Sequence, residues 1–178
     1  ANKELLESMA TNFKDLAFSV SIDGIKDRFE YLRHPGKWDD VRDNLDYYYE
    51  LHTGNYPVNV QITHTVTALN VMYLPEFHDY FKNRWPNFKI WNNVAHYPKW
   101  LTCSVLPIGA KKEITKQLQA YDFGVYKSEI DSLIEYMNTP LYQNGESVAG
   151  NVRDRFDKKR LEMFDGRGIE KKYDTFKN

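Results

Sequence analysis

Apolar and polar residues alternate along two stretches of this chain. Between residues 16 and 22 the even positions are apolar and the odd positions are alanine or serine. Between residues 58 and 66 the even positions carry valine, isoleucine and His64, while asparagine, glutamine and threonine fill the odd ones. Because side chains of a strand point alternately to its two faces, each stretch predicts a strand with one apolar and one small or polar face. Residues 88–95 predict a third strand.

Helical spacing of apolar residues separates and follows these strands. The predicted order of elements along the chain is therefore helix, strand, helix, strand, helix, strand and then further helices. Crossovers of this length between strands predict parallel pairing and an α/β fold. The expected helices cover residues 2–10, 37–51, 70–83, 110–121 and 127–137.

Two arrangements of the predicted sheet remain open. In a (βα) barrel the apolar strand faces pack on outer helices and the other faces line the interior. The interior would then be polar, which suits a wet, ligand-holding cavity, since a fully packed barrel prefers Val, Ile and Leu inside. The alternative is a half-exposed antiparallel sheet with its polar face in water. The candidate interior positions are Ser19, Ser21, Asn59, Gln61, Thr63 and Thr65.

Composition narrows the class of protein. The 178 residues suffice for one domain with a proper core, and 42% hydrophobic and 15% aromatic residues argue against disorder. Since 24 basic and 25 acidic residues leave a net charge of −1, no strong field favours nucleic acid or an anionic membrane. No apolar run approaches the roughly 20 residues of a membrane span. Neither nucleic acid nor a membrane is therefore expected as a partner.

The chain start and its single cysteine point to a cytoplasmic protein. Charged residues interrupt Leu5, Leu6 and Met9, so no signal-peptide pattern is present. Residues 3–9 resemble the end of a helix already under way, and Ala1 fits either removal of an initiator Met or an internal cut. Cys103 alone provides no disulfide framework, and a reducing cytoplasm is the expected compartment.

The predicted first strand ends in Ser21-Ile22-Asp23-Gly24, a candidate binding site. Ser21 and Asp23 share a strand face, and a hydroxyl with a carboxylate there could bind ribose hydroxyls or an amino group. Gly24 permits a sharp turn and close ligand approach. Sites in parallel α/β folds gather at the carboxyl ends of strands. On its own, however, the tetrapeptide is more typical of a simple turn.

A longer run carries a resemblance to a known family. Ser21-x-Asp23-Gly24 is followed by Arg28-Phe29-Glu30-Tyr31-x-Arg33, Pro35, Lys37-Trp38, Val41 and Asn44-Leu45. In order and spacing this run resembles radical S-adenosylmethionine (SAM) enzymes of the SPASM/twitch group, particularly versions from phage and marine microbial genomes. Weaker similarity continues through Val60-x-Ile62, Thr65-Val66, Asn70, Asn93-Val-Ala-His96 and Leu106-Pro107, and is vague over residues 154–164.

The resemblance implies a partial parallel (βα) barrel, the second half of a radical SAM barrel, over residues 1–107. A C-terminal helical extension would follow over residues 108–178. By motif position, the residues beside SAM would be Ser21, Asp23, Gly24 and Arg33. The substrate contacts at the tops of the later strands would be Thr65, Asn70, Asn93 and His96.

The chain also departs from the family. A [4Fe–4S] cluster that leaves one iron open needs three thiolates, normally from a CxxxCxxC loop, and this sequence has one cysteine. The cluster could come only through a missing N-terminal half or a partner subunit. We therefore expect a SAM- and substrate-binding half of an enzyme. In its complete form, that enzyme forms a 5′-deoxyadenosyl radical and abstracts hydrogen from a peptide or small-molecule substrate.

An alternative function remains: a non-catalytic module that retains the barrel cleft for a peptide or nucleotide. Other residues give little further chemistry. No two of the five histidines form an HxH or HxxxH pair, so no metal site is expected. His64 is expected to pack in a strand, His78 to lie on a helix surface and Cys103 to be an inert, half-buried thiol. Packing is also expected for Tyr47–Tyr49, Trp85, Trp91 and Trp100, and a solvated face for residues 153–160.

Overall fold

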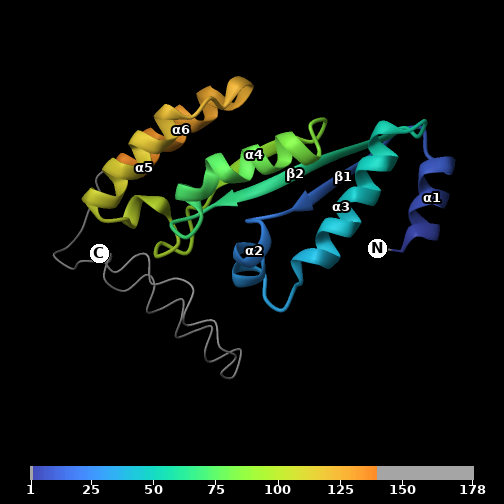
Figure 1. The fold of residues 1–178 in the computed structure, drawn as a ribbon, viewed down its shortest axis with the longest axis horizontal. Helices are drawn as coiled ribbons and strands as arrows, with labels where there is room; N and C mark the ends of the chain where they lie inside the picture. Colours follow the sequence, from blue (N-terminus) through green and yellow to red (C-terminus); the bar gives the residue numbers. More distant parts are fainter. Residues whose placement is uncertain (1, 140–178) are drawn as a thin grey trace.

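The computed structural model describes residues 2–139 of the chain. A parallel sheet of three strands forms the centre of this part. The strands β1 (Leu16–Ser21), β2 (Val58–Val66) and β3 (Lys89–Val94) lie side by side in chain order. Helices α2 (Lys26–Leu32) and α3 (Trp38–Thr53) connect the first pair, and α4 (Leu74–Arg84) connects the second (Figure 1). The predicted parallel pairing is confirmed, and the antiparallel alternative is wrong.

The remaining helices flank this sheet. Helix α1 (Lys3–Asn12) leads into β1, and α5 (Ile108–Ala120) and α6 (Lys127–Asn138) follow β3. All three were predicted within a few residues, but α2 was not. The short turns are η1 (Val71–Tyr73), η2 (Cys103–Val105) and η3 (Gly124–Tyr126). No helix within residues 2–139 is both long and apolar enough to cross a bilayer. The C-terminal part of the predicted extension, including residues 153–160 and 154–164, lies outside the described residues.

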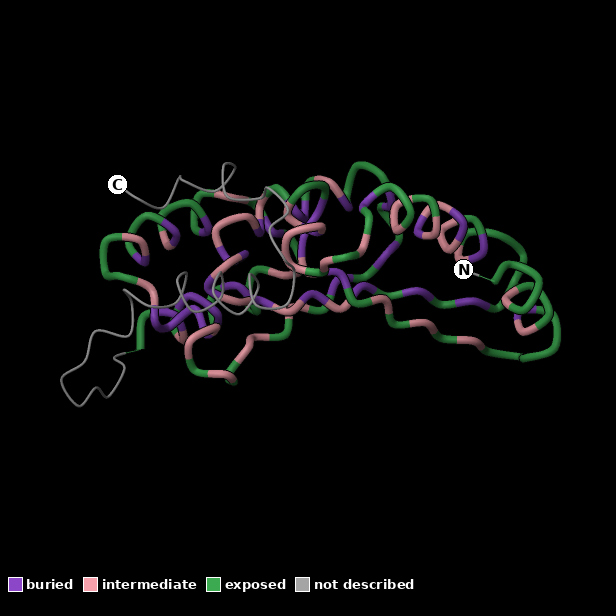
Figure 2. The backbone as a smooth tube through the Cα atoms, turned by 90° about the horizontal axis from the view of Figure 1, so that it is seen from below, coloured by how far each residue is buried: buried purple, intermediate pink, exposed green. Residues whose placement is uncertain are grey.

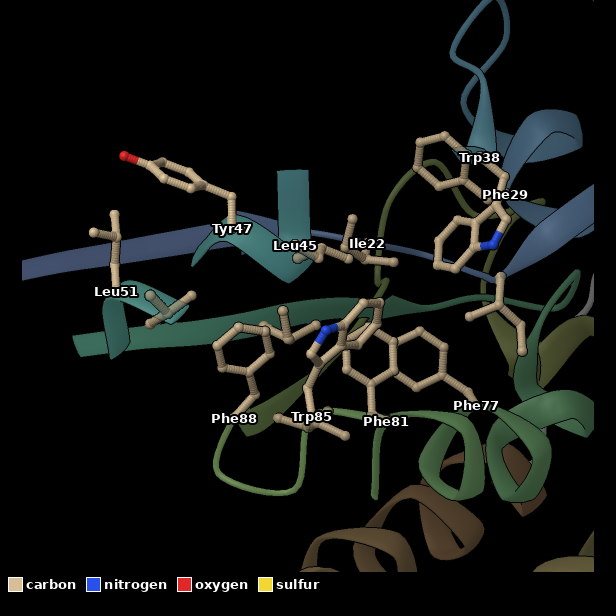
Figure 3. Close-up of a cluster of buried hydrophobic side chains, with 14 of the residues drawn as sticks. Ile22, Phe29, Trp38, Leu45, Tyr47, Leu51, Phe77, Phe81, Trp85 and Phe88 are labelled. Atoms are coloured by element: carbon tan, nitrogen blue, oxygen red, sulfur yellow. The ribbon is translucent and has the colours of Figure 1, made fainter. Parts of the chain in front are cut away.

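Within residues 2–139, helices cover one face of the sheet and leave the other uncovered. Along β2 the even positions are buried and the odd positions are exposed or half-buried, as the sequence predicted (Figure 2). The buried face meets side chains of α3 and α4, among them Leu45, Phe77 and Phe81, with Trp85 after α4 (Figure 3). The opposite face carries the small and polar residues and is called the open face below.

A second hydrophobic cluster lies beside the first. It joins the start of α4 and the end of β2 to the helix pair α5–α6. Ile114 and Leu118 of α5 pack there with Ile130 and Met137 of α6, and all four are at most 4% exposed. The described part of the C-terminal extension is therefore anchored to the sheet unit by its own core.

The two edges of the sheet differ. Because Leu16 and Ile22 donate their amides to β2, the odd-numbered residues of β1 direct their backbone groups outward. No strand within residues 2–139 pairs with them. On the outer edge of β3, by contrast, the Ile90 amide donates to the Tyr126 hydroxyl at 3.1 Å. The β3 edge is therefore partly capped by Tyr126 of η3, whereas no strand among the described residues covers the β1 edge.

Candidate functional site

Asp23 joins the ends of β1 and β2 at the carboxyl edge of the sheet. Its Oδ1 accepts the Thr65 amide at 2.9 Å, and its Oδ2 accepts Arg33 Nε at 2.7 Å. Arg33 Nη2 lies 2.6 Å from the same Oδ2. Thus the carboxylate and the guanidinium that the sequence assigned to SAM do meet, but both carboxylate oxygens already have partners within the chain.

Asn70 also connects the ends of β1 and β2. Its Nδ2 donates to the Asp23 carbonyl at 2.9 Å and to the Thr65 carbonyl at 2.8 Å, while its Oδ1 accepts the Thr67 amide at 2.7 Å. The residue is only 2% exposed. Asp23, Arg33, Thr65 and Asn70 are called the strand-end lock below. The sequence predicted Asn70 as a substrate contact, whereas its polar atoms are all used to hold the lock.

Two further predicted site residues, Ser21 and Asn93, lie on the open face, which Thr65 of the lock shares. Ser21 lies at the end of β1, and Thr65 and Asn93 are direct partners across β2 and β3. Ser21 and Asn93 are exposed, and Thr65 is half-buried. One row further down, the Ser19 and Thr63 hydroxyls lie 2.6 Å apart and bond to each other. The open face therefore offers hydroxyl and amide groups beside the strand-end lock.

Trp91 is a further candidate for ligand binding, although the sequence predicted that its side chain is packed. The structure shows this prediction to be wrong, because Trp91 lies on the open face and is 56% exposed. It is the register partner of Thr63, which in turn pairs with Ser21. Its odd position in β3, shared with Lys89 and Asn93, was the signal that could have found it. An exposed indole among polar side chains can stack on a planar ligand.

His96 lies apart from the lock, beyond the end of β3. Its ring packs edge-on against Tyr136 of α6, with centroids 4.7 Å apart, and the residue is exposed. The structure therefore places His96 at the contact between the sheet end and the C-terminal helices. As predicted, it is near a strand top, but its neighbour comes from the extension.

Gly24 and His64 border a small cavity behind the lock. A Cβ at Gly24 would lie 3.3 Å from the backbone of Arg28 and Phe29, so a larger residue there would require α2 to shift by a few tenths of an ångström. Arg28 forms an ion pair with Glu76 and lies over the Tyr73 ring at 3.9 Å. The cavity measures about 10 Å³, roughly the space of one water molecule.

His64 packs in the strand, as predicted, and is 1% exposed. Its Nδ1 lies 3.0 Å from the Ile22 carbonyl and so carries the hydrogen, which leaves Nε2 as an acceptor. That nitrogen is buried and has no hydrogen-bond partner within residues 2–139. Burial, together with nearby His78, lowers the pKa of His64 to about 3. Its imidazole is therefore neutral at physiological pH, and its hydrogen bond to Ile22 holds the chain in place directly after β1.

His78 and Cys103 depart from their predicted environments. His78 was predicted on a helix surface, which is wrong: it is 5% exposed, and burial lowers its pKa to about 4. Cys103 is completely rather than half buried, and burial raises its pKa to about 11. The thiol is therefore unreactive, in agreement with the inert residue that was predicted.

The chain's own residues do not fit an iron–sulfur cluster. Three thiolates would be needed, whereas the sequence has only Cys103, and that thiol is buried and hard to ionise. Among residues 2–139 no three His, Cys, Asp or Glu side chains gather as metal ligands would. The open face, with Ser21, Asn93 and Trp91, does offer the groups that a nucleoside-like molecule needs. No family model, curated protein or solved structure matches this chain.

Proposed function

We propose that this chain is the SAM- and substrate-binding half of a radical SAM enzyme. Residues 1–107 would then be the second half of its (βα) barrel. The run from Ser21 to Leu45, which resembles that family, supports the proposal. The observation that carries it is the asymmetry of the sheet in the described part of the chain: helices cover one face and Tyr126 partly caps one edge, whereas no described element covers the other face or edge.

Strand order supports a barrel-like winding. The strands follow one another in the order β1-β2-β3, and the connecting helices α3 and α4 pack on the same face (Figure 3). In a barrel that common face is the outside, and the polar open face is the interior. Serine, threonine and asparagine on the open face suit an interior that holds a ligand and water.

Burial decreases toward β1 in the way that a missing neighbour would cause. On the helix-covered face, Val58, Val60 and Ile62 of β2 are at most 5% exposed. Their counterparts in β1 are only half-buried, although they are equally apolar. An added strand with its own helix would cover them. The partner expected here is the N-terminal cluster-binding half, whether it belongs to the same protein or to another subunit.

The residues of this chain would bind and orient rather than carry out chemistry. The Ser21 hydroxyl and the Asn93 amide can form hydrogen bonds with the polar groups of SAM. Arg33 and Asp23 hold the ends of β1 and β2 in place. The cleavage of SAM to a 5′-deoxyadenosyl radical requires a cluster from the other half. Hydrogen abstraction from a peptide or small molecule would follow in the complete enzyme, in a reducing cytoplasm.

We expect the backbone amides of β1 to exchange with solvent in an alternating pattern. Ala17 and Ser19 direct their amides outward, so they should exchange at least about 100-fold faster than the amides of Phe18 and Val20. The Ile90 amide on the other edge should be protected by Tyr126. Hydrogen exchange followed by NMR measures all of these rates. Equal protection of Ala17 and Phe18 would show a covered edge and contradict the proposal.

Binding of S-adenosylhomocysteine to the full chain tests the site itself. NMR shifts are expected at the carboxyl ends of the three strands, and Ser21→Ala should weaken binding about fivefold, because one hydrogen bond contributes about 1 kcal/mol. Ser132→Ala on α6 is the matched control and should have no effect. The proposal fails if Ser21→Ala behaves like this control. Formation of 5′-deoxyadenosine by the isolated, reduced chain would also contradict it.

A further inference from the structure

A cavity lies on the helix-covered side of the sheet, away from the open face. It measures about 220 Å³ and is bounded by α4, the start of β3 and the segment around η3. It shares no residue with the strand-end lock. Its lining is largely aromatic. Tyr121 and Tyr126 are half-buried and face the cavity with part of their surface, whereas Phe81, Trp85, Phe88 and Phe123 are at most 6% exposed and form its packed floor.

The rim of this cavity carries charges of both signs. Lys82 and Asp122 line it, and both residues are exposed. Asp122 Oδ1 accepts the Gly124 amide at 2.9 Å, which leaves Oδ2 for a ligand. The Tyr126 oxygen accepts the Ile90 amide, so its hydrogen remains free to donate. The cavity is thus bordered by aromatic rings, by one hydroxyl next to β3, and by an exposed cation and an exposed anion.

The volume of the cavity and the chemistry of its lining residues together indicate the kind of ligand. Pockets for drug-sized molecules begin at about 300 Å³, so this cavity suits a molecule with one ring. Aromatic rings prefer edge-to-face or offset contacts with other rings, which this lining can provide. A carboxylate beside Lys82 and an ammonium beside Asp122 would each gain a charge-assisted hydrogen bond. We propose that the cavity binds a free aromatic α-amino acid, with its ring inside and its two charges at the rim.

The backbone favours an opening at this place. Gly124 adopts a positive φ of 54°, and a Cβ built there meets nothing within 4 Å. Val125, the next residue, is 89% exposed although it borders the cavity. The η3 segment therefore forms one wall of the cavity without closing it. The cavity is separate from the residues assigned to SAM, so ligand binding here is independent of the radical SAM assignment.

Calorimetric titration of the full chain with L-phenylalanine tests the proposal. A dissociation constant of about 2 mM or tighter is expected for a ligand of roughly 12 heavy atoms. NMR shifts should centre on the amides of Gly124 and Val125. Phenethylamine lacks the carboxylate and phenylacetate lacks the ammonium, so each should bind at least about fivefold more weakly. Equal affinity for all three would overturn the proposal.

Two variants test the charges at the rim. Asp122→Asn keeps the bond to the Gly124 amide and removes the charge, and Lys82→Gln removes the other charge. Each should weaken phenylalanine binding about fivefold, and Lys116→Gln, an exposed lysine on α5, should not. N-acetyl-phenylalaninamide represents an aromatic side chain within a protein. If it binds as tightly as phenylalanine, the cavity docks a protein partner and the amino-acid assignment is wrong.

Discussion

Acidification from pH 6.5 to pH 4 is expected to destabilise the fold by several kcal/mol, through two buried histidines. Burial lowers the pKa of His64 from 6.5 to about 3 and that of His78 to about 4. Both are therefore neutral in the folded protein, while the unfolded chain takes up a proton on each below pH 6.5. Because the unfolded state binds more protons, the contribution of the two histidines to stability falls as the pH falls through this window and is constant above it.

The slope of stability against pH provides the measurement. Each histidine contributes about 1.4 kcal/mol per pH unit between its two pKa values. His64→Asn keeps a donor for the Ile22 carbonyl and should remove one such contribution, and His78→Gln should remove the other. Urea unfolding at pH 5, 5.5, 6 and 7 gives the slope for the wild type, each variant and the pair. A slope that neither variant changes would exclude this origin.

Asn70→Asp is expected to destabilise the folded protein by at least about 3 kcal/mol. Asn70 Nδ2 donates to the carbonyls of Asp23 and Thr65 from a position that is 2% exposed. An aspartate has the same shape, but it would place a carboxylate oxygen against these two carbonyl oxygens. Repulsion and loss of two buried hydrogen bonds then act together. Urea unfolding at pH 7 measures the change.

Asn55→Asp is the matched control, because Asn55 is exposed in the turn after α3. Its effect should stay within about 0.5 kcal/mol. Asn70→Ala should fall between the two, since it removes the donor without adding a charge. If Asn70→Asp matched the control, Asn70 would not hold the strand ends together. The amide shifts of Thr65 and Thr67 should move in Asn70→Asp and stay in place in the control.

The sheet could be predicted from local patterns because its physical cause is local. Alternation over residues 58–66 reproduced β2 to the residue, since one face of that strand is buried and the other is not. The length of the connections between the strands predicted that the strands run parallel. Helix α2 was missed because its seven residues include a single buried side chain, Phe29, and so present no repeated stripe.

The positions of the site residues followed from the sequence, but their contacts did not. The sequence placed Asp23 at the end of one strand and Thr65 and Asn70 at the end of the next, and parallel strands bring such ends to one edge of the sheet. Their roles depended on distances: Asp23 accepts from Arg33 and Thr65, and Asn70 is buried under both strand ends. Thr65 is 42 residues and Asn70 is 47 residues from Asp23 along the chain, and no local sequence pattern indicates contacts over such separations.

The sequence by itself therefore determined the α/β class, the strand faces and the gathering of polar residues at the strand ends, because these follow from periodicity and chain direction. Only the tertiary structure decided which side chains are covered. His78 is buried because Phe123 and Tyr126 pack on its ring from the C-terminal unit, whereas Trp91 is exposed because no element within residues 2–139 covers the open face. Burial depends on what packs against a residue from elsewhere in the chain.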